Sequence, residues 1–61
     1  MKYYSIGDIV LTKKGFLGKI TSIIKGAKSI GYVIENCEDR QFHRHENIFG
    51  RIEQIWTNHL A

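Results

Sequence analysis

Residues 7–24 read GDIVLTKKGFLGKITSII, and this stretch predicts the fold class. A run of strand-forming residues at 9–12 follows a Gly-Asp pair, and the segment 13–15, which ends in glycine, interrupts it. Strand-forming residues return at 17–24, where four of the eight side chains are isoleucine or threonine. Because β-branched side chains suit the pleated surface of a sheet, the stretch predicts two short strands joined by a glycine-bearing loop.

The rest of the chain continues this alternation of short strand-forming runs and polar turns. Segment 25–28 contains Gly26 and predicts a turn, and segment 30–35 predicts a third strand. Segment 36–39 predicts a second turn, because its side chains bond to their own backbone, and segment 40–44 predicts a fourth strand. Strands of about five residues with turns every 8–12 residues are typical of all-β barrels and sandwiches. With five strands we expect a partly open barrel, since closure hides strand edges.

The segment 46–60 allows two structures. Its apolar residues recur at helical spacing, and they are Ile48, Ile52, Ile55, Trp56 and Leu60. Gly50 disfavours a helix by about 1 kcal/mol relative to alanine. We therefore expect a helical turn at 45–48 followed by a short last strand, with a C-terminal helix as the alternative.

The composition is that of one small, basic domain. The 61 residues allow a single domain, residues 1–61, with a formal net charge of +3 and a pI near 9.3. The one cysteine, Cys37, cannot form an internal disulfide, and no apolar run is long enough to span a membrane. These features predict a cytoplasmic protein. The positive charge favours a polyanion or an acidic protein surface as the partner.

Several glycine-centred positions resemble the opening of SH3-like and KOW-like domains, and they are Gly7-Asp8, Val10, Gly15 and Gly18-Lys19-Ile20. The later segments IGYVIEN, residues 30–36, and HENIFGRI, residues 45–52, are similar to the third strand and to the helical turn before the last strand. The resemblance covers about residues 6 to 55. It implies an all-β fold, a small five-stranded SH3-like barrel with a short helical turn before the last strand.

This barrel has a predicted core and a predicted bend. We expect Gly18 to sit in a strongly bent or bulged strand, because glycine lets the chain turn sharply. The residues that we expect to be buried are Val10, Ile20, Ile34, Phe42 and Ile52.

Three kinds of relative within this fold imply different functions. KOW modules bind RNA or ribosomal and transcription proteins. Small SH3-like proteins encoded by phages and prophages resemble the chain in length. The type II dihydrofolate reductases, which are tetrameric enzymes, share framework positions with it, namely Gly7-Asp8, Gly18, Gly31-Tyr32 and Ile34-Glu35. Gln41-Phe42-His43 stands where that family has Gln-Ile-Tyr, so His43 replaces the tyrosine.

The residues that carry chemistry form no catalytic constellation. The serines lack a nucleophile-elbow context, and the sequence has neither paired carboxylates nor a phosphate loop. His43 and His45 stand at i and i+2, where Glu38 and Glu46 could join them around a divalent metal. The ligand spacing of a full site is missing, so we expect two solvated histidines on the outer face opposite Phe42, and neither a metal nor a cofactor.

Two candidate binding surfaces remain. Basic residues interspersed with aromatic rings suit single-stranded nucleic acid, and the candidates are Lys13, Lys14, Lys25, Lys28, Arg40 and Arg44. Apolar residues on the outward faces of strands suit a protein partner or a second copy of the chain, and the candidates are Ile9, Leu11, Val33 and Trp56. The first hypothesis is a non-enzymatic binding module, a phage or bacterial accessory protein that binds a host protein or forms a homodimer. The alternatives are a nucleic-acid-binding module that uses its loop lysines, and an oligomeric reductase.

Overall fold

The computed structural model describes residues 3–53, which form an all-β domain. Its elements are β1 (Ile9–Thr12), β2 (Leu17–Lys25), β3 (Ile30–Glu35), β4 (Arg40–Arg44), the 3-10 helix η1 (His45–Asn47) and β5 (Ile48–Arg51). The predicted succession of five strands along the chain, with a helical turn before the last one, is confirmed. Within residues 3–53, no helix is long and apolar enough to cross a membrane.

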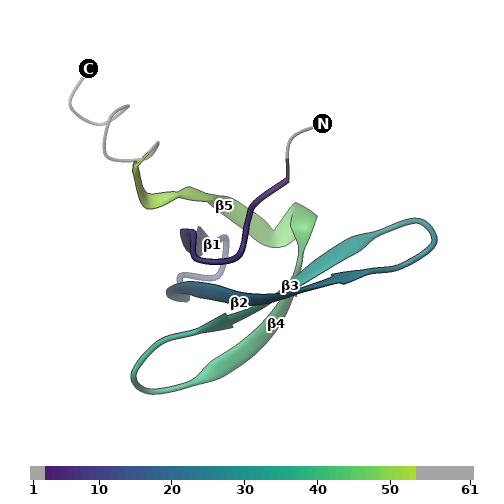
Figure 1. Ribbon diagram of the computed structural model, residues 1–61. Coiled ribbons are helices and arrows are strands. Elements are labelled where there is room, and N and C mark those ends of the chain that lie inside the picture. Colours follow the sequence, from purple (N-terminus) through teal and green to yellow (C-terminus); the bar gives the residue numbers. More distant parts are fainter. Residues whose placement is uncertain (1–2, 54–61) are drawn as a thin grey trace.

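The five strands form one antiparallel sheet in the order β4-β3-β2-β1-β5 (Figure 1). β1 pairs with β2 on one side and with β5 on the other, so the first and last strands of the sequence lie side by side. The β2–β3 turn and the β3–β4 turn lie at opposite ends of this sheet (Figure 1). The arrangement is compatible with a small barrel-like fold, and β4 is an edge strand within the described part of the chain.

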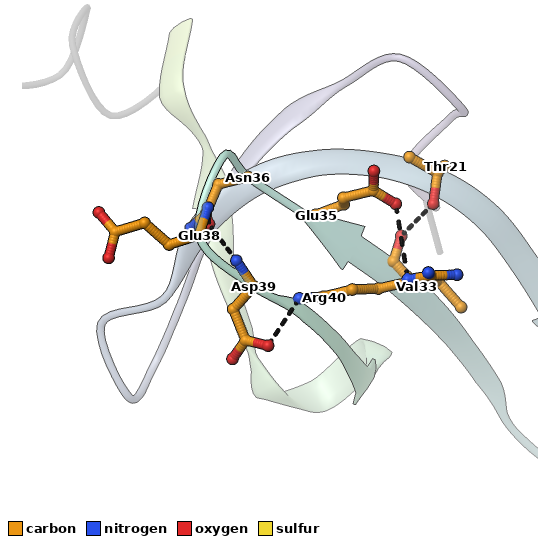
Figure 2. A network of polar contacts seen from close by, with 7 residues as sticks. All are labelled: Thr21, Val33, Glu35, Asn36, Glu38, Asp39 and Arg40. Atoms are coloured by element: carbon orange, nitrogen blue, oxygen red, sulfur yellow. Dashed lines mark hydrogen bonds and ion pairs between the residues drawn. The ribbon is translucent and has the colours of Figure 1, made fainter.

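β2 contains a bulge, as predicted, although the bulge is not at Gly18. The register between β2 and β3 shifts at Thr21, whose Oγ1 donates a hydrogen bond of 3.4 Å to the Val33 carbonyl (Figure 2). Gly18 lies earlier in β2, where an added Cβ would come within 2.7 Å of the Glu35 carbonyl oxygen. The close approach of β3 therefore explains the glycine at this position.

The core consists of side chains from four strands. The buried apolar residues are Val10, Ile20, Tyr32, Ile34 and Ile48. Thr12 is buried beside them, and its Oγ1 accepts a hydrogen bond of 2.9 Å from the Phe16 amide. The burial predicted for Val10, Ile20 and Ile34 is confirmed.

Two of the predicted core residues, Phe42 and Ile52, are not buried. Phe42 is 52% exposed and Ile52 is 38% exposed. In the last strand Ile48 fills the core instead, because it follows η1 directly and pairs with the buried Thr12 of β1. Ile52 comes after β5 ends at Arg51, where the backbone turns helical, so it leaves the sheet before it can join the core.

The orientation of β4 explains the exposure of Phe42. In the β3–β4 register Tyr32 pairs with His43, and Val33 pairs with Phe42. Because paired residues of an antiparallel sheet share a face, the buried Tyr32 brings His43 to the inner face that covers the core. Phe42 then points to the opposite, outer face, together with the half-buried Val33.

Candidate functional site

The outer face of β4 carries an exposed ring between two exposed guanidinium groups. Arg40, Phe42 and Arg44 are exposed, whereas Gln41 and His43 between them are half-buried. Since successive side chains of a strand alternate between faces, the three exposed side chains lie in one row on the outer face. The sheet order leaves β4 with only β3 as a neighbour among residues 3–53, so this row borders solvent.

The neighbouring strands extend this row into a surface. Gly31 pairs with Arg44 on one side and with Ile24 on the other, and Val33 pairs with Phe42. Ile24 is 51% exposed. A Cβ on Gly31 would overlap the outer atoms of the Phe42 ring, so the ring lies over the Gly31 backbone. We call this area the Phe42 surface, and it consists of Ile24, Val33, Arg40, Phe42 and Arg44.

The two arginines of the Phe42 surface have different electrostatic surroundings. Arg40 Nε lies 3.8 Å from Glu35 Oε2, and both side chains are exposed (Figure 2). Glu35 also pairs with Lys19 in the β2–β3 register. Arg40, Glu35 and Lys19 are therefore cross-strand neighbours whose charges alternate. The cross-strand neighbours of Arg44 are Gly31 on β3 and, beyond it, Ile24 on β2. Arg44 makes no ion pair within the described residues.

The β3–β4 turn fixes the start of β4. Asn36 Oδ1 accepts hydrogen bonds of 2.8 Å from the Glu38 amide and 2.9 Å from the Asp39 amide, while Asn36 Nδ2 donates to the Leu17 carbonyl (Figure 2 shows the turn). The Asp39 carboxylate accepts hydrogen bonds from Gln41 Nε2 and from the Arg40 amide, and these donors lower the pKa of the Asp39 carboxyl. The turn thus bonds to both β2 and β4.

The six basic candidates do not form one cluster. Lys13 and Lys14 lie in the β1–β2 loop, whereas Lys25 and Lys28 lie at the β2–β3 turn, and β2 separates these two positions. Arg44 pairs with Gly31, next to the residues of the β2–β3 turn. The segment 9–34 contains five lysines and no acidic residue. Of the four candidate lysines, Lys25 and Lys28 are thus the ones at the end of the sheet where Arg44 lies.

The two histidines have structural partners on the inner side. The Tyr32 hydroxyl oxygen accepts a hydrogen bond of 3.2 Å from the Tyr4 amide and lies 2.9 Å from His45 Nδ1. Burial raises the pKa of the Tyr32 hydroxyl. His43 stacks on Phe16 with ring centroids 6.0 Å apart. The predicted outer-face position is wrong for His43, because His43 lies on the inner face and Phe42 on the outer one, and both histidines are half-buried rather than solvated.

These polar contacts offer no donor set for a metal ion. His43 Nε2 lies 2.7 Å from Gln41 Oε1, and His45 Nδ1 lies 2.9 Å from the Tyr32 hydroxyl. These two ring nitrogens therefore already have polar partners within the protein. Within residues 3–53, no group of three histidine, cysteine or carboxylate side chains is placed to hold a metal. Cys37 is exposed in the β3–β4 turn.

The apolar interface candidates divide between two places. Ile9 is exposed and Leu11 half-buried, and Leu11 pairs with the exposed Leu17 of β2. Val33 lies beside Phe42, and Trp56 lies outside the described residues. The exposed Phe49 of β5 was not among the sequence-based candidates. The alternation of charged and aromatic residues in Arg40–Arg44 was the signal that could have identified Phe42 as a surface residue.

The comparisons with known proteins found no match: no protein-family description, no curated protein and no solved structure is significantly similar to this chain.

Proposed function

We propose that this chain is a non-enzymatic, SH3-like binding module that binds nucleic acid through the Phe42 surface. The observation that carries the proposal is the exposed Phe42 ring between Arg40 and Arg44 on one face of an edge strand. Nucleic-acid surfaces combine rings that stack on bases with cations that neutralise phosphates. The resemblance to KOW-like and phage-encoded SH3-like proteins supports a role in the cytoplasm of a bacterium or of a phage host.

Charge favours a polyanion over a neutral apolar partner. Interfaces with proteins are depleted of charge at their centre, although arginine and aromatic residues are common there. On the Phe42 surface both residues flanking the ring are arginines, and Lys28 lies in the β2–β3 turn beyond the Ile24–Gly31 pair next to Arg44. A ligand that covers Phe42 therefore meets positive charge along the strand and at one end.

A protein partner stays the second candidate, on a different surface. The observation that favours it is the cross-strand pair of Leu11 with the 45% exposed Leu17, near the 62% exposed Phe49 on β5. Exposed apolar side chains on neighbouring strands suit a protein contact, including one with a second copy of the chain. This surface does not include Phe42, so the two candidate functions can be tested separately.

The polar side chains that could suggest an enzyme have structural partners instead. The polar groups that resemble a reductase framework are Gln41 and His43, and they bond to each other beside Phe16. Tyr32 and His45 form a second polar contact that ties β3 to η1. Both contacts join elements of the fold, and this structural role accounts for these polar groups without a reaction.

Fluorescence anisotropy with labelled RNA and DNA oligonucleotides at low salt tests the proposal. We expect binding that weakens steeply as salt increases, because neutralised phosphates release counterions. The double variant Lys28→Gln/Arg44→Gln should bind much more weakly. Lys13→Gln/Lys14→Gln removes the same charge from the β1–β2 loop and should keep most of the affinity. An absence of binding by the wild type at low salt would refute the proposal.

A further inference from the structure

We propose that the Phe42 surface is specific for single-stranded nucleic acid, with one base stacked on the Phe42 ring and the sugar–phosphate backbone running along β4 toward Arg44. This inference rests on the proposed function, and it adds the form of the nucleic acid and the direction in which it lies. It follows from the support under the ring, from the spacing of the arginines and from the position of Glu35.

The Phe42 ring contacts the sheet at Gly31 and is otherwise largely exposed. Its outer atoms lie over Gly31, where any side chain would overlap them, and Val33 is its cross-strand partner. Phe42 is 52% exposed, so a large part of its side chain can contact a planar ligand. The bases of a duplex are stacked on each other, whereas the bases of a single strand have open faces. The exposed ring therefore favours a single strand.

The spacing of the two arginines suits a single-stranded nucleic acid that passes across the Phe42 ring. Arg40 and Arg44 are four residues apart, which corresponds to about 13 Å along an antiparallel strand, with Phe42 midway between them. A base on Phe42 is then flanked on both sides by cations that can reach the sugar–phosphate backbone. Arginine suits this role because its planar guanidinium binds phosphate oxygens in a forked geometry.

Glu35 makes the two ends of the surface unequal. Its carboxylate lies 3.8 Å from Arg40 Nε, so it competes with a phosphate for that guanidinium and repels the phosphate (Figure 2). The cross-strand neighbours of Arg44 are Gly31 and Ile24, and neither is acidic. The tighter phosphate contact is therefore at Arg44, and the nucleic acid extends toward Lys28 in the β2–β3 turn.

Anisotropy titrations with a labelled oligothymidylate of about 12 nucleotides, within the usual range of single-strand site sizes, test this inference. The comparison probe is a duplex of the same length. Phe42→Leu keeps an apolar cover on Gly31 but removes the aromatic face, and Phe42→Trp keeps that face. Phe49→Leu is the matched control, because Phe49 is also exposed but lies on β5. Thermal unfolding of each variant verifies that it folds.

We expect Phe42→Leu to weaken oligothymidylate binding at least about fivefold, the lower end of what loss of a base–aromatic stack causes. Phe42→Trp and Phe49→Leu should bind within about twofold of the wild type, and the duplex should bind more weakly than the single strand. Equal affinity of Phe42→Leu and the wild type, or equal affinity for duplex and single strand, would overturn the inference and leave the proposed function standing. Binding to neither probe would overturn both.

Three further measurements test the two arginine contacts and separate a nucleic acid from a merely acidic ligand. Glu35→Gln should tighten oligothymidylate binding, because Arg40 is then free to meet a phosphate. Arg44→Gln should lower the salt slope by about 0.7, the value for one phosphate of a single strand. Polyglutamate at equal charge concentration should not displace the oligonucleotide. Efficient displacement would show that the surface recognises charge alone, as an acidic protein partner would require, and would overturn the inference.

Discussion

The Phe42 ring lies over Gly31, its diagonal neighbour across the β3–β4 pair. A hydrogen at this position lets the ring lie against the backbone, and the ring in turn covers a stretch of β3 that has no side chain of its own. The exposed aromatic residue thereby has a defined position on the sheet. Glycine beneath an aromatic neighbour is a recurrent means of holding a ring on a sheet surface.

Gly31→Ala should displace the Phe42 ring without unfolding the protein. The atoms that the new Cβ would meet belong to the end of a partly exposed side chain, which can rotate away. We expect a change in unfolding free energy of less than about 1 kcal/mol, because lower backbone entropy of the unfolded chain offsets part of the lost contact. Phe42 ring proton shifts, measured by NMR, should change strongly. Unchanged ring shifts would contradict the contact between these two residues.

Gly18→Ala should be far more destabilising. Here the Cβ would lie 2.7 Å from the Glu35 carbonyl oxygen and 2.8 Å from Ile34 Cγ2, and neither the β3 backbone nor a buried side chain can move freely. We expect a loss of about 1–3 kcal/mol, the usual cost of overpacking. Gly26→Ala is the matched control, because its nearest neighbour, the Ser29 carbonyl oxygen, lies at 3.4 Å. Urea unfolding of both variants measures the difference, and equal stabilities would contradict the close approach of β2 and β3.

Tyr32→Phe should destabilise the fold and change its pH dependence. Loss of the hydroxyl leaves the Tyr4 amide and His45 Nδ1 without this partner, which costs about 1–3 kcal/mol where such groups are buried. Burial raises the pKa of Tyr32 in the folded state, so the unfolded chain loses the hydroxyl proton first. The stabilisation from Tyr32 is therefore complete below the ordinary tyrosine pKa of about 10 and declines as the pH rises above it.

Unfolding of the wild type and of Tyr32→Phe at several pH values tests this relationship. The difference in unfolding free energy should be constant up to about pH 9 and should shrink above about pH 10. The two chains differ only in this hydroxyl group, so the comparison isolates its contribution. A difference that grows with pH would show that Tyr32 is ionised more easily in the folded state, contrary to its burial.

Asn36→Ala should loosen the β3–β4 turn. The variant loses the acceptor of the Glu38 and Asp39 amides and the donor to the Leu17 carbonyl. These groups are exposed and can bond to water instead, so we expect a loss of about 1 kcal/mol in unfolding free energy. Cys37→Ser is the control, because Cys37 is exposed in the same turn. If both variants unfold at the same denaturant concentration, the turn contributes no measurable stability.

The local residue preferences in the sequence were sufficient to predict where the strands begin and end. The glycine and Asx residues at the turns and the β-branched residues between them predicted β1 to β4 within one residue at each boundary. The turn of η1 and the following strand were also predicted, because Gly50 disfavours a longer helix there. Strand alternation around Val10 correctly placed Ile9 and Leu11 on the side away from the core.

The sequence alone determined that this chain forms short antiparallel strands with the turns in their observed places, since turn preference and strand propensity act over a few neighbouring residues. Only the tertiary structure decided which face of β4 meets the core, because that choice depends on the register with β3 and on burial of Tyr32, which lies in another strand. The same register brings Phe42 between two outward arginines and over Gly31. The candidate binding surface is thus a product of strand pairing, and strand pairing is a long-range property.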